Sequence, residues 1–503
     1  MKRYLALTLG PIYKTISMTK RTRHLWGASY LFSYLMREII KEVRKSKDTT
    51  ILVPFVNEEN LTAKNGAGLF PDRLLLESKS MSATDLKKIV DAICSKIALE
   101  GGLTDASILQ NYLHTFLFEC EEGGENPILQ LQKHLDAMEQ MPMYQANNNF
   151  DLIFFLDKIN GAVFYAAAGR PKEGFPSIAD IATKDLANEE AYKIIKNEFK
   201  NDDEQLFMKK LSTDKILKEK LLNYHHYIAI VQADGDNIGK TIAAIGTDSE
   251  KMNAFSKDLF DFSKEALGKI KDYGGEAVFA GGDDLLFFAP LANATKNDCS
   301  TILQLIHQID GVFKAKLTNN SAYHVGNVKP TLSFGVSVTY YKFPLGESRE
   351  TAGNALFKKA KDGDKNALAL DLQKHSHSGA EIDLFYRKEN EAFNSLIVNE
   401  LVKLRTEKEV APMLHSVAQI FTSQKAILQD IAKSTEHQAN RLEYFFKNNF
   451  NESVHKPYHE GGFFSTLQTA MLLAIKDYGA EKGLKTIEQL IDIQHFIHRK
   501  TKD

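Results

Sequence analysis

Acidic residues follow strand-like segments in the middle of the chain. Asp234-Gly235-Asp236 comes directly after the apolar run Tyr227–Gln232, and Asp283-Asp284 stands in a Gly-Gly-Asp-Asp turn. Carboxylates gathered at one sheet edge repel one another, so some take up protons unless cations are bound. Hard cations prefer oxygen ligands, and two ions about 3.5–4 Å apart support phosphoryl transfer. We therefore predict Asp234, Asp283 and Asp284 as catalytic metal ligands for two Mg²⁺ or Mn²⁺ ions.

Glycine and lysine residues near these carboxylates suit a bound nucleotide. A glycine backbone can approach phosphate closely, and lysines at the end of a helix could reach it. The alternatives without a catalytic role are a simple hairpin turn for the acidic motifs and a solvated helix end for the lysines. Asp236 is expected mainly to shape its loop. The predicted nucleotide-binding residues are Gly235, Asp236, Gly281, Gly282, Lys358, Lys361, Lys365 and Asn366.

The order of elements around the acidic motifs predicts the sheet that carries them. From residue 227 the pattern reads strand, helix, hairpin, helix, strand, helix, strand, which is the split βαβ order of a ferredoxin-like palm. In that order the first strand and the hairpin strands are neighbours. The expected segments are strands at 227–232, 277–280, 285–289, 331–341 and 367–372, and helices at 301–317 and 352–361.

The first part of the chain has a related but weaker pattern. Tyr4–Leu9 and Ile51–Val56 read as strands, and apolar residues at helical spacing predict a helix over Thr22–Val43. Phe150–Leu156 and Ala162–Ala168 also read as strands, joined by a turn at Asn160-Gly161, with a mostly helical insertion over 83–143 between them and the earlier elements. Gly10-Pro11 stands where a working palm would place carboxylates, so this half is expected to be catalytically silent.

These patterns predict an α+β protein with two ferredoxin-like palm domains, a helical insertion and a C-terminal helical domain. The expected domains are 1–170 for the silent palm-like domain, 171–223 for a helical linker domain, 224–387 for the catalytic palm and 388–503 for the C-terminal helices. A chain of 503 residues is long enough for several domains.

Composition limits the other classes of protein. The net charge of −2 excludes a polycation that binds nucleic acid by bulk attraction, so such contacts should come from local patches or partner chains. The basic start of the chain is either a solvated surface or a contact for guide RNA or a neighbouring subunit; its cations are Lys2, Arg3, Lys14, Lys20, Arg21 and Arg23. Three separated cysteines argue against a disulfide framework or a four-cysteine zinc site and fit a reducing cytoplasm. We expect no signal peptide and no membrane-spanning segment.

Several longer motifs resemble one family. The stretches ADGDNIGK (233–240), GGDD (281–284) and AKDGDKNALAL (360–370) with the following KHSHSGAE are similar to the palm domain of the large subunit of type III CRISPR effector complexes. The Cmr subtype fits best. Near the N-terminus, GPI (10–12), TRHLWGAS (22–29) and LFPDR (69–73) resemble motifs of the same subtype.

The resemblance implies a function for the acidic site. In this family the palm converts ATP into a signalling nucleotide, usually cyclic oligoadenylate, when the complex binds target RNA. It implies that Asp234, Asp283 and Asp284 hold metal, and that Lys361 and Lys365 contact phosphates. It also implies a cytoplasmic role in antiviral defence, with guide RNA, target RNA and other complex subunits as partners. Transfer of adenylate to another acceptor, such as S-adenosylmethionine, stays open.

The chain departs from many members of this family. Those members begin with a His-Asp nuclease domain, but this chain has no adjacent His-Asp pair, so no DNase activity is expected. His225-His226 is interpreted as the entry to a strand, and any zinc site would have to use histidines. A diguanylate cyclase is an alternative function, although Asp284-Leu285-Leu286 lacks the acidic residue and phenylalanine of the GGDEF pattern. A non-catalytic scaffold subunit is another.

Overall fold

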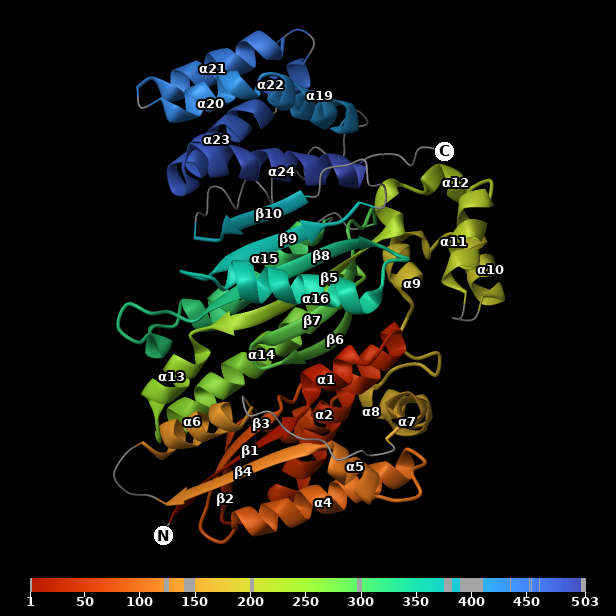
Figure 1. Cartoon of the computed structure of the whole chain (residues 1–503), viewed down its shortest axis with the longest axis vertical. Coiled ribbons are helices and arrows are strands. Elements are labelled where there is room, and N and C mark those ends of the chain that lie inside the picture. Colours follow the sequence, from red (N-terminus) through yellow and green to blue (C-terminus); the bar gives the residue numbers. More distant parts are fainter. Residues whose placement is uncertain are drawn as a thin grey trace.

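The computed structural model shows two β-sheets and a helical end arranged along the long axis of the molecule (Figure 1). A four-stranded sheet lies nearest the N-terminus, a six-stranded sheet lies in the middle, and the last helices lie at the far end. The structure describes residues 2–121, 126–139, 150–199, 203–295, 301–374, 382–389, 410–434, 436–451, 453, 455–460 and 462–498.

The first sheet contains β1 (Arg3–Gly10), β2 (Thr49–Val53), β3 (Arg73–Ser78) and β4 (His114–Glu121). Its strand order is β2-β3-β1-β4, and every neighbouring pair is antiparallel. With α2 (Thr22–Val43) after β1 and α4 (Ala83–Glu100) after β3, this is the split βαβ order of a ferredoxin-like sheet.

Alternating side chains of β1 divide this sheet between two cores. Leu5 and Leu7 are fully buried in a core that contains α2 and α4. Tyr4 and Ala6, on the opposite face, pack with α6 (Pro127–Glu139) and with Met252 at the start of α14 (Ser249–Tyr273). This alternation is the two-residue period of a strand buried on both faces.

The six-stranded sheet repeats the order of the first sheet and extends it. Its strands are β5 (Tyr227–Asp236), β6 (Glu276–Gly281), β7 (Asp284–Pro290), β8 (Thr331–Tyr340), β9 (Ala367–Leu372) and β10 (Ile382–Arg387). The order is β10-β9-β8-β5-β7-β6, so β8-β5-β7-β6 corresponds to β4-β1-β3-β2 of the first sheet. The predicted split βαβ order is therefore present, and β9 is added parallel to β8.

Helices cover both faces of the six-stranded sheet. On one face Ala229 and Val231 pack with residues of α14 and α15 (Ile302–Phe313). On the other face Ile228 and Ile230 share a core with α2, α9 (Ile178–Ala182) and α16 (Leu345–Ala355). Helix α2 thus packs against both sheets, which fixes the first sheet beside the second.

The remaining described elements are short helices or belong to the helical regions. The linker region carries η2 (Lys184–Leu186), α10 (Glu190–Glu198), α11 (Glu204–Thr213), α12 (Leu217–Lys220) and η3 (Asn223–His226). The other short elements are α1 (Ile12–Ser17), α3 (Glu58–Thr62), α5 (Ser107–Tyr112), α13 (Ile238–Ile245), η4 (Lys314–Thr318), η5 (Ser321–Tyr323) and η6 (Leu356–Ala360). The last helices are α19 (Val410–Ser423), α20 (Lys425–Lys433), α21 (Gln438–Asn449), α22 (Lys456–Glu460), α23 (Phe463–Tyr478) and α24 (Ala480–His498).

The predicted strands at 150–156 and 162–168 are wrong. This segment forms α7 (Leu152–Ile159), the π-helical turn η1 (Asn160–Phe164) and α8 (Tyr165–Ala168). The buried positions Leu152, Phe155, Leu156 and Ile159 have helical spacing. Asn160 is not a turn residue, because it is 2% exposed and its amide donates to the carbonyl of Arg23 at 3.3 Å.

The third and fourth strands of the first sheet are formed by residues 73–78 and 114–121, not by the segments predicted as strands. Strand β3 was not predicted, and β4 lies inside the segment 83–143 that was expected to be mostly helical. The side chains of β4 are half-buried or exposed along its whole length, and its apolar run Phe116-Leu117-Phe118 interrupts the alternation of apolar and polar residues that identifies a strand. Within the described residues the C-terminal region is helical, as expected, while residues 390–409 lie outside them. No described helix is both long and apolar enough to cross a bilayer.

Candidate active site

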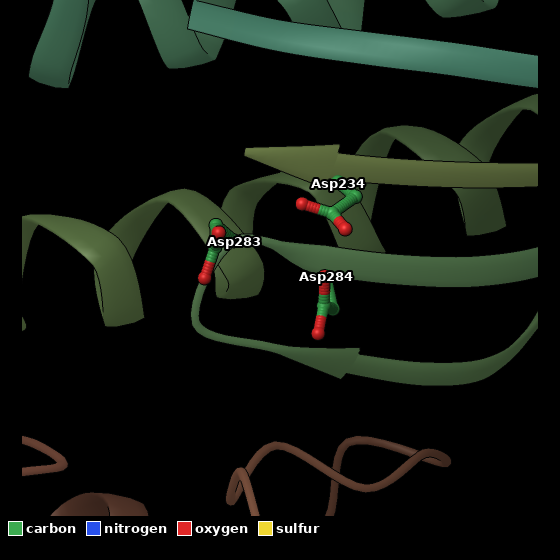
Figure 2. A group of neighbouring side chains, drawn as sticks. All are labelled: Asp234, Asp283 and Asp284. Atoms are coloured by element: carbon green, nitrogen blue, oxygen red, sulfur yellow. The ribbon is translucent and has the colours of Figure 1, made fainter. Parts of the chain in front are cut away.

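The three predicted metal ligands lie together at one edge of the six-stranded sheet (Figure 2). Asp234 is near the end of β5, Asp283 is in the turn after β6, and Asp284 begins β7. Strands β5 and β7 are paired, with Ala233 opposite Leu285, which places Asp234 beside Asp284. One carboxylate oxygen from each residue lies within 4.8 Å of the others. This spacing suits oxygen ligands that surround a divalent cation.

Glycine is required where the carboxylates approach the backbone. A Cβ atom on Gly235 would overlap the carboxylate of Asp283. Gly282 has a φ of +67°, a left-handed conformation that glycine adopts without strain. The hydroxyl of Ser263 on α14 donates to the carbonyl of Gly282 at 2.7 Å and fixes the turn to the helix.

The three carboxylates repel one another and are difficult to ionise together. Burial and then the charge of Asp234 raise the pKa of Asp283 to about 7. Asp284 has an exposed side chain, yet the surrounding protein limits its hydration, and this effect, followed by the charge of Asp283, raises its pKa well above the usual range. Burial also raises the pKa of Asp234, although Lys361 opposes this shift. A bound divalent cation would relieve this repulsion, so the donor set fits a metal site.

Lys361 is the predicted phosphate-binding residue that lies closest to the cluster. Its ammonium contacts the carboxylate of Asp234 and donates to the carbonyl of Gly235 at 3.0 Å. Lys358 lines the cavity described below. Lys365 and Asn366 have left-handed φ values of 62° and 48°, and the charge of Lys365 lowers the pKa of Asp234.

Asp236 lies behind the cluster as an anchor for the loop. It is fully buried, and its Oδ2 accepts hydrogen bonds from Thr331 Oγ1 at 2.9 Å and Ser333 Oγ at 2.7 Å on β8. The same oxygen accepts from the backbone N–H of Asn366 at 3.1 Å. Asp236 therefore connects β5 to β8 and to the loop that carries Lys361 and Lys365.

A cavity of about 650 Å³ opens beside the acidic cluster, between the two sheets. Its lining on the N-terminal side includes Tyr13, Ile16, Phe32, Phe70 and Asp72. On the other side the second sheet contributes Gln232, Asp234 and Asp284, and the helical segment α16–η6 contributes Arg349, Glu350, Asn354, Phe357 and Lys358. The two sides are joined by backbone, since the N–H of Ala280 donates to the carbonyl of Gly68 at 3.0 Å. The mixture of apolar walls and a few polar groups is typical of small-ligand sites.

The sequence patterns did not predict the residues on the N-terminal side of this cavity as part of the site. The carboxylate of Asp72 is close enough to raise the pKa of Asp284, although it comes from the loop before β3. Arg349 is 6% exposed, and its guanidinium lies over the ring of Tyr13, 4.9 Å from the ring centre. Its Nε has no hydrogen-bond partner among the described residues. No spacing in the sequence links these positions to the acidic motifs, because tertiary packing alone brings them together.

Other predicted features are placed away from any metal cluster. His225 pairs with the buried carboxylate of Asp185 at 2.9 Å, which leaves it in a structural role at the entry to β5. In the part of the chain that the structure describes, Asp234, Asp283 and Asp284 are the one group of three or more potential ligands found close together. The end of β1 carries Gly10 and the following Pro11, and no carboxylate stands there.

Comparisons with known proteins agree with this architecture. Residues 227–369 match the family model described as Cas10/Cmr2, second palm domain, and residues 4–101 match that of the CRISPR-associated protein Cmr2, N-terminal. The chain is 28% identical over 180 residues to the CRISPR system Cmr subunit Cmr2 of Pyrococcus furiosus. That match covers 30% of this chain and 19% of the relative, so it spans about a fifth of the relative's length.

Solved structures of two type III systems share the fold. A type III-B Cmr-beta complex in its apo state has a chain with a TM-score of 0.55 at 11% identity, covering 89% of this chain and 77% of that one. A Csm1–Csm4 subcomplex of the type III-A Csm interference complex gives 0.53 at 10% identity, covering 99% and 70%. A Csm1–Csm4 cassette in complex with cA3 gives the same TM-score and the same coverage.

The six-stranded sheet with its acidic turn is a palm domain within a mixed α+β protein that also has helical regions. The chain carries two domains of the Cas10/Cmr2 family, the Cmr2 N-terminal domain and the second palm domain. The resemblance of the sequence motifs to this family is confirmed.

Proposed function

We propose that this chain is a nucleotidyltransferase subunit of a type III CRISPR effector complex. On binding of target RNA to the complex, it uses ATP to make a signalling nucleotide for antiviral defence. The observation that carries this proposal is the cluster of Asp234, Asp283 and Asp284, with ligand oxygens within 4.8 Å of one another at the mouth of a cavity of about 650 Å³. A purely structural turn would not require three mutually repelling carboxylates beside a cavity.

Different residues of the site have different roles in nucleotidyl transfer. Asp234, Asp283 and Asp284 would hold two Mg²⁺ or Mn²⁺ ions, which neutralise phosphate charge and activate the attacking hydroxyl when bound. Lys361 and Lys365 bind the phosphates from the side of β5 opposite the turn. The apolar walls of the cavity bind the nucleoside and exclude water from the reacting groups.

The first sheet is proposed to be a second palm that has no catalytic role. Its strand order is the same as that of β5 to β8, but no carboxylate follows β1 at Gly10. It contributes instead the other wall of the cavity, through α1, α2 and the loop at Phe70 and Asp72. This arrangement supports the expectation of two palm domains, one catalytic and one silent.

The acceptor of the adenylyl group is the open part of the proposal. A second adenylate would lead to cyclic oligoadenylate, and similar Csm1–Csm4 cassettes have been solved in complex with cA3 and cA4. A cationic acceptor such as S-adenosylmethionine is favoured by one observation, because the carboxylates of Asp72 and Glu350 also line the cavity. Mass spectrometry of the product separates the two outcomes.

The partners are proposed from the family and the fold. They are the other subunits of a type III ribonucleoprotein, its guide RNA and the target RNA. The fold is shared with a type III-B Cmr-beta complex that was solved bound to cognate target RNA. The cytoplasm is the compartment in which such a complex would act.

The proposed function is tested by ATP turnover in the assembled complex with Mg²⁺ or Mn²⁺, in the presence and in the absence of target RNA. We expect turnover that depends on both the metal and the target. A product made only from GTP would favour a diguanylate cyclase. A chain whose melting temperature does not respond to ATP and Mn²⁺ would favour a scaffold subunit.

A further inference from the structure

A second cavity lies where the starts of four helices, α2, α9, α11 and α16, meet. It has a volume of about 450 Å³ and shares no lining residue with the catalytic cavity. Its walls come from the start of α2, the segment at Phe175–Ile178, the start of α11 and the loop between β8 and α16. We call it the basic pocket; its lining residues are Lys20, Arg21, Thr22, Arg23, Phe175, Ser177, Ile178, Asp203, Glu204, Gln205, Tyr341, Lys342, Phe343, Pro344 and Leu345.

Cations dominate the rim of the basic pocket. Lys20, Arg21 and Arg23 stand at the start of α2, and Lys342 stands on the opposite wall. Helix α2 has no acidic residue in its first turn and no side-chain cap, so the positive end of its dipole adds to these charges. The cations near the start of the chain therefore belong to two separate places. Lys2 pairs with Glu77 at 3.4 Å on the first sheet, whereas Lys20, Arg21 and Arg23 line the basic pocket.

The two acidic residues of the basic pocket offset only part of this charge. The carboxylate of Asp203 accepts the backbone N–H of Leu206 at 2.9 Å and so caps α11. Burial raises the pKa of Glu204 to about 7, which leaves this group partly protonated near neutral pH. Arg23 also lies 3.7 Å from Asp157, outside the pocket. Lys20, Arg21 and Lys342 are exposed and line the pocket, and the charge of Arg21 acts against the rise in the pKa of Glu204.

Aromatic side chains form the inner surface of the same pocket. Phe175 is 3% exposed and Tyr341 is 6% exposed, while Phe343 is half-buried. Aromatic rings beside cations are the combination that binds nucleotides, since bases stack on rings and phosphates pair with Lys or Arg. A volume of about 450 Å³ is in the range of small-ligand sites.

We propose that the basic pocket binds a phosphorylated nucleoside, either as a free nucleotide or as one residue of a single-stranded RNA. Arg21 and Lys342 contact the phosphate from opposite walls, and Phe343 stacks on the base. The occupant touches Pro344 and Leu345, where α16 begins, and the same helix supplies Arg349 and Asn354 to the catalytic cavity. The pocket is therefore a separate site joined to the catalytic cavity by one helix.

The test is binding to the full chain in EDTA, so that sites that depend on divalent cations make no contribution. One arm uses AMP and the other a short fluorescent single-stranded RNA. The double variant Arg21→Glu with Lys342→Glu replaces two exposed cations, and Phe343→Ala removes the ring. For whichever of the two probes the pocket binds, AMP or RNA, we expect the double variant to weaken binding at least about tenfold. We expect Phe343→Ala to weaken it less. Lys88→Glu is the matched control, because this exposed cation lies on α4.

The two arms identify the source of the nucleotide. Loss of RNA binding with AMP binding unchanged or absent supports an RNA strand, and loss of AMP binding supports a free nucleotide. Equal affinities for the double variant and for Lys88→Glu in both arms would overturn the proposal. The variants' circular dichroism must match that of the unchanged chain. Because no turnover is measured, a negative result leaves the proposed function standing.

Discussion

The ammonium of Lys361 contacts the carboxylate of Asp234, a residue 127 positions earlier in the chain. This contact joins the loop after η6 to the end of β5 and places a cation beside the acidic cluster. It also explains why the pKa of Asp234 is raised less strongly than burial alone would dictate. The predictions below depend on this arrangement of charges.

Replacing Lys361 with methionine should reduce product formation at least about tenfold, because a charge-assisted contact to phosphate is worth about 1.5–3 kcal/mol. The measurement is the rate of ATP consumption by the target-bound complex. Lys359→Met is the control, since Lys359 instead contacts Asp383 at 2.7 Å. Equal losses in the two variants would show that the effect is not specific to the acidic cluster.

Gly235→Ala should abolish metal-dependent activity, because the added Cβ overlaps the carboxylate of Asp283 and displaces it. The readout is the increase in melting temperature caused by Mn²⁺ and ATP, which this variant should lose. Gly268→Ala, in the middle of α14 with open space around its Cβ position, should stabilise the protein by about 0.5–1 kcal/mol. Normal Mn²⁺ binding by Gly235→Ala would contradict the assigned ligand geometry.

The stability of the metal-free protein should fall as pH rises. Ionisation of Asp283 is disfavoured in the folded chain, where its pKa is about 7, relative to an unfolded value of about 3.9. The folded state therefore holds more protons between these values, and the contribution of Asp283 to stability declines from about pH 4 to about pH 7. Thermal unfolding in EDTA at several pH values measures this decline. Asp283→Asn should flatten it; the same slope in this variant would argue against the raised pKa.

Asp236→Asn should destabilise the fold, in contrast to Asp234→Asn. Asp236 is buried, and an amide in its place keeps an oxygen for the three hydrogen bonds only by putting its NH₂ where Oδ1 now lies 3.7 Å from the ammonium of Lys361. The substitution therefore removes the negative charge that strengthens these bonds and sets a donor against a cation. We expect a loss of about 1–3 kcal/mol in denaturant unfolding. Asp234→Asn should keep its stability but lose the Mn²⁺-dependent shift. Equal destabilisation by both substitutions would contradict the separate roles of the two residues.

The acidic site could be predicted because each part of it follows a strong local pattern. Asp234 ends an apolar strand, and Asp283 and Asp284 follow two glycines in a hairpin, so the split βαβ order alone predicts that they meet. The helix Thr22–Val43 was predicted with the correct bounds because its buried residues repeat at helical spacing. These features lie in short stretches of the sequence, where the periodicity of apolar residues indicates helix or strand.

The opposite wall of the cavity could not be predicted in the same way. Tyr13 and Asp72 reach the site through the packing of one sheet on the other, and no spacing in the sequence records that contact. Strand β4 was missed because apolar residues stand on both of its faces and none is fully buried. The segment from Leu152 to Ala168 was taken as strands because short apolar runs do not distinguish strand from helix. In each case tertiary contacts decided the structure.

The central claim is that Asp234, Asp283 and Asp284 hold the metal ions for adenylyl transfer. Its most direct test is mass spectrometry of the products that the target-bound complex makes from ATP and Mn²⁺, with and without S-adenosylmethionine, comparing the unchanged chain with the double variant Asp283→Ala and Asp284→Ala. We predict an adenylate-containing product from the unchanged chain and at least a hundredfold less from the variant, on the order of the about 3 kcal/mol that a lost charge-stabilising group costs. The same product in the same amount from both complexes would contradict the claim.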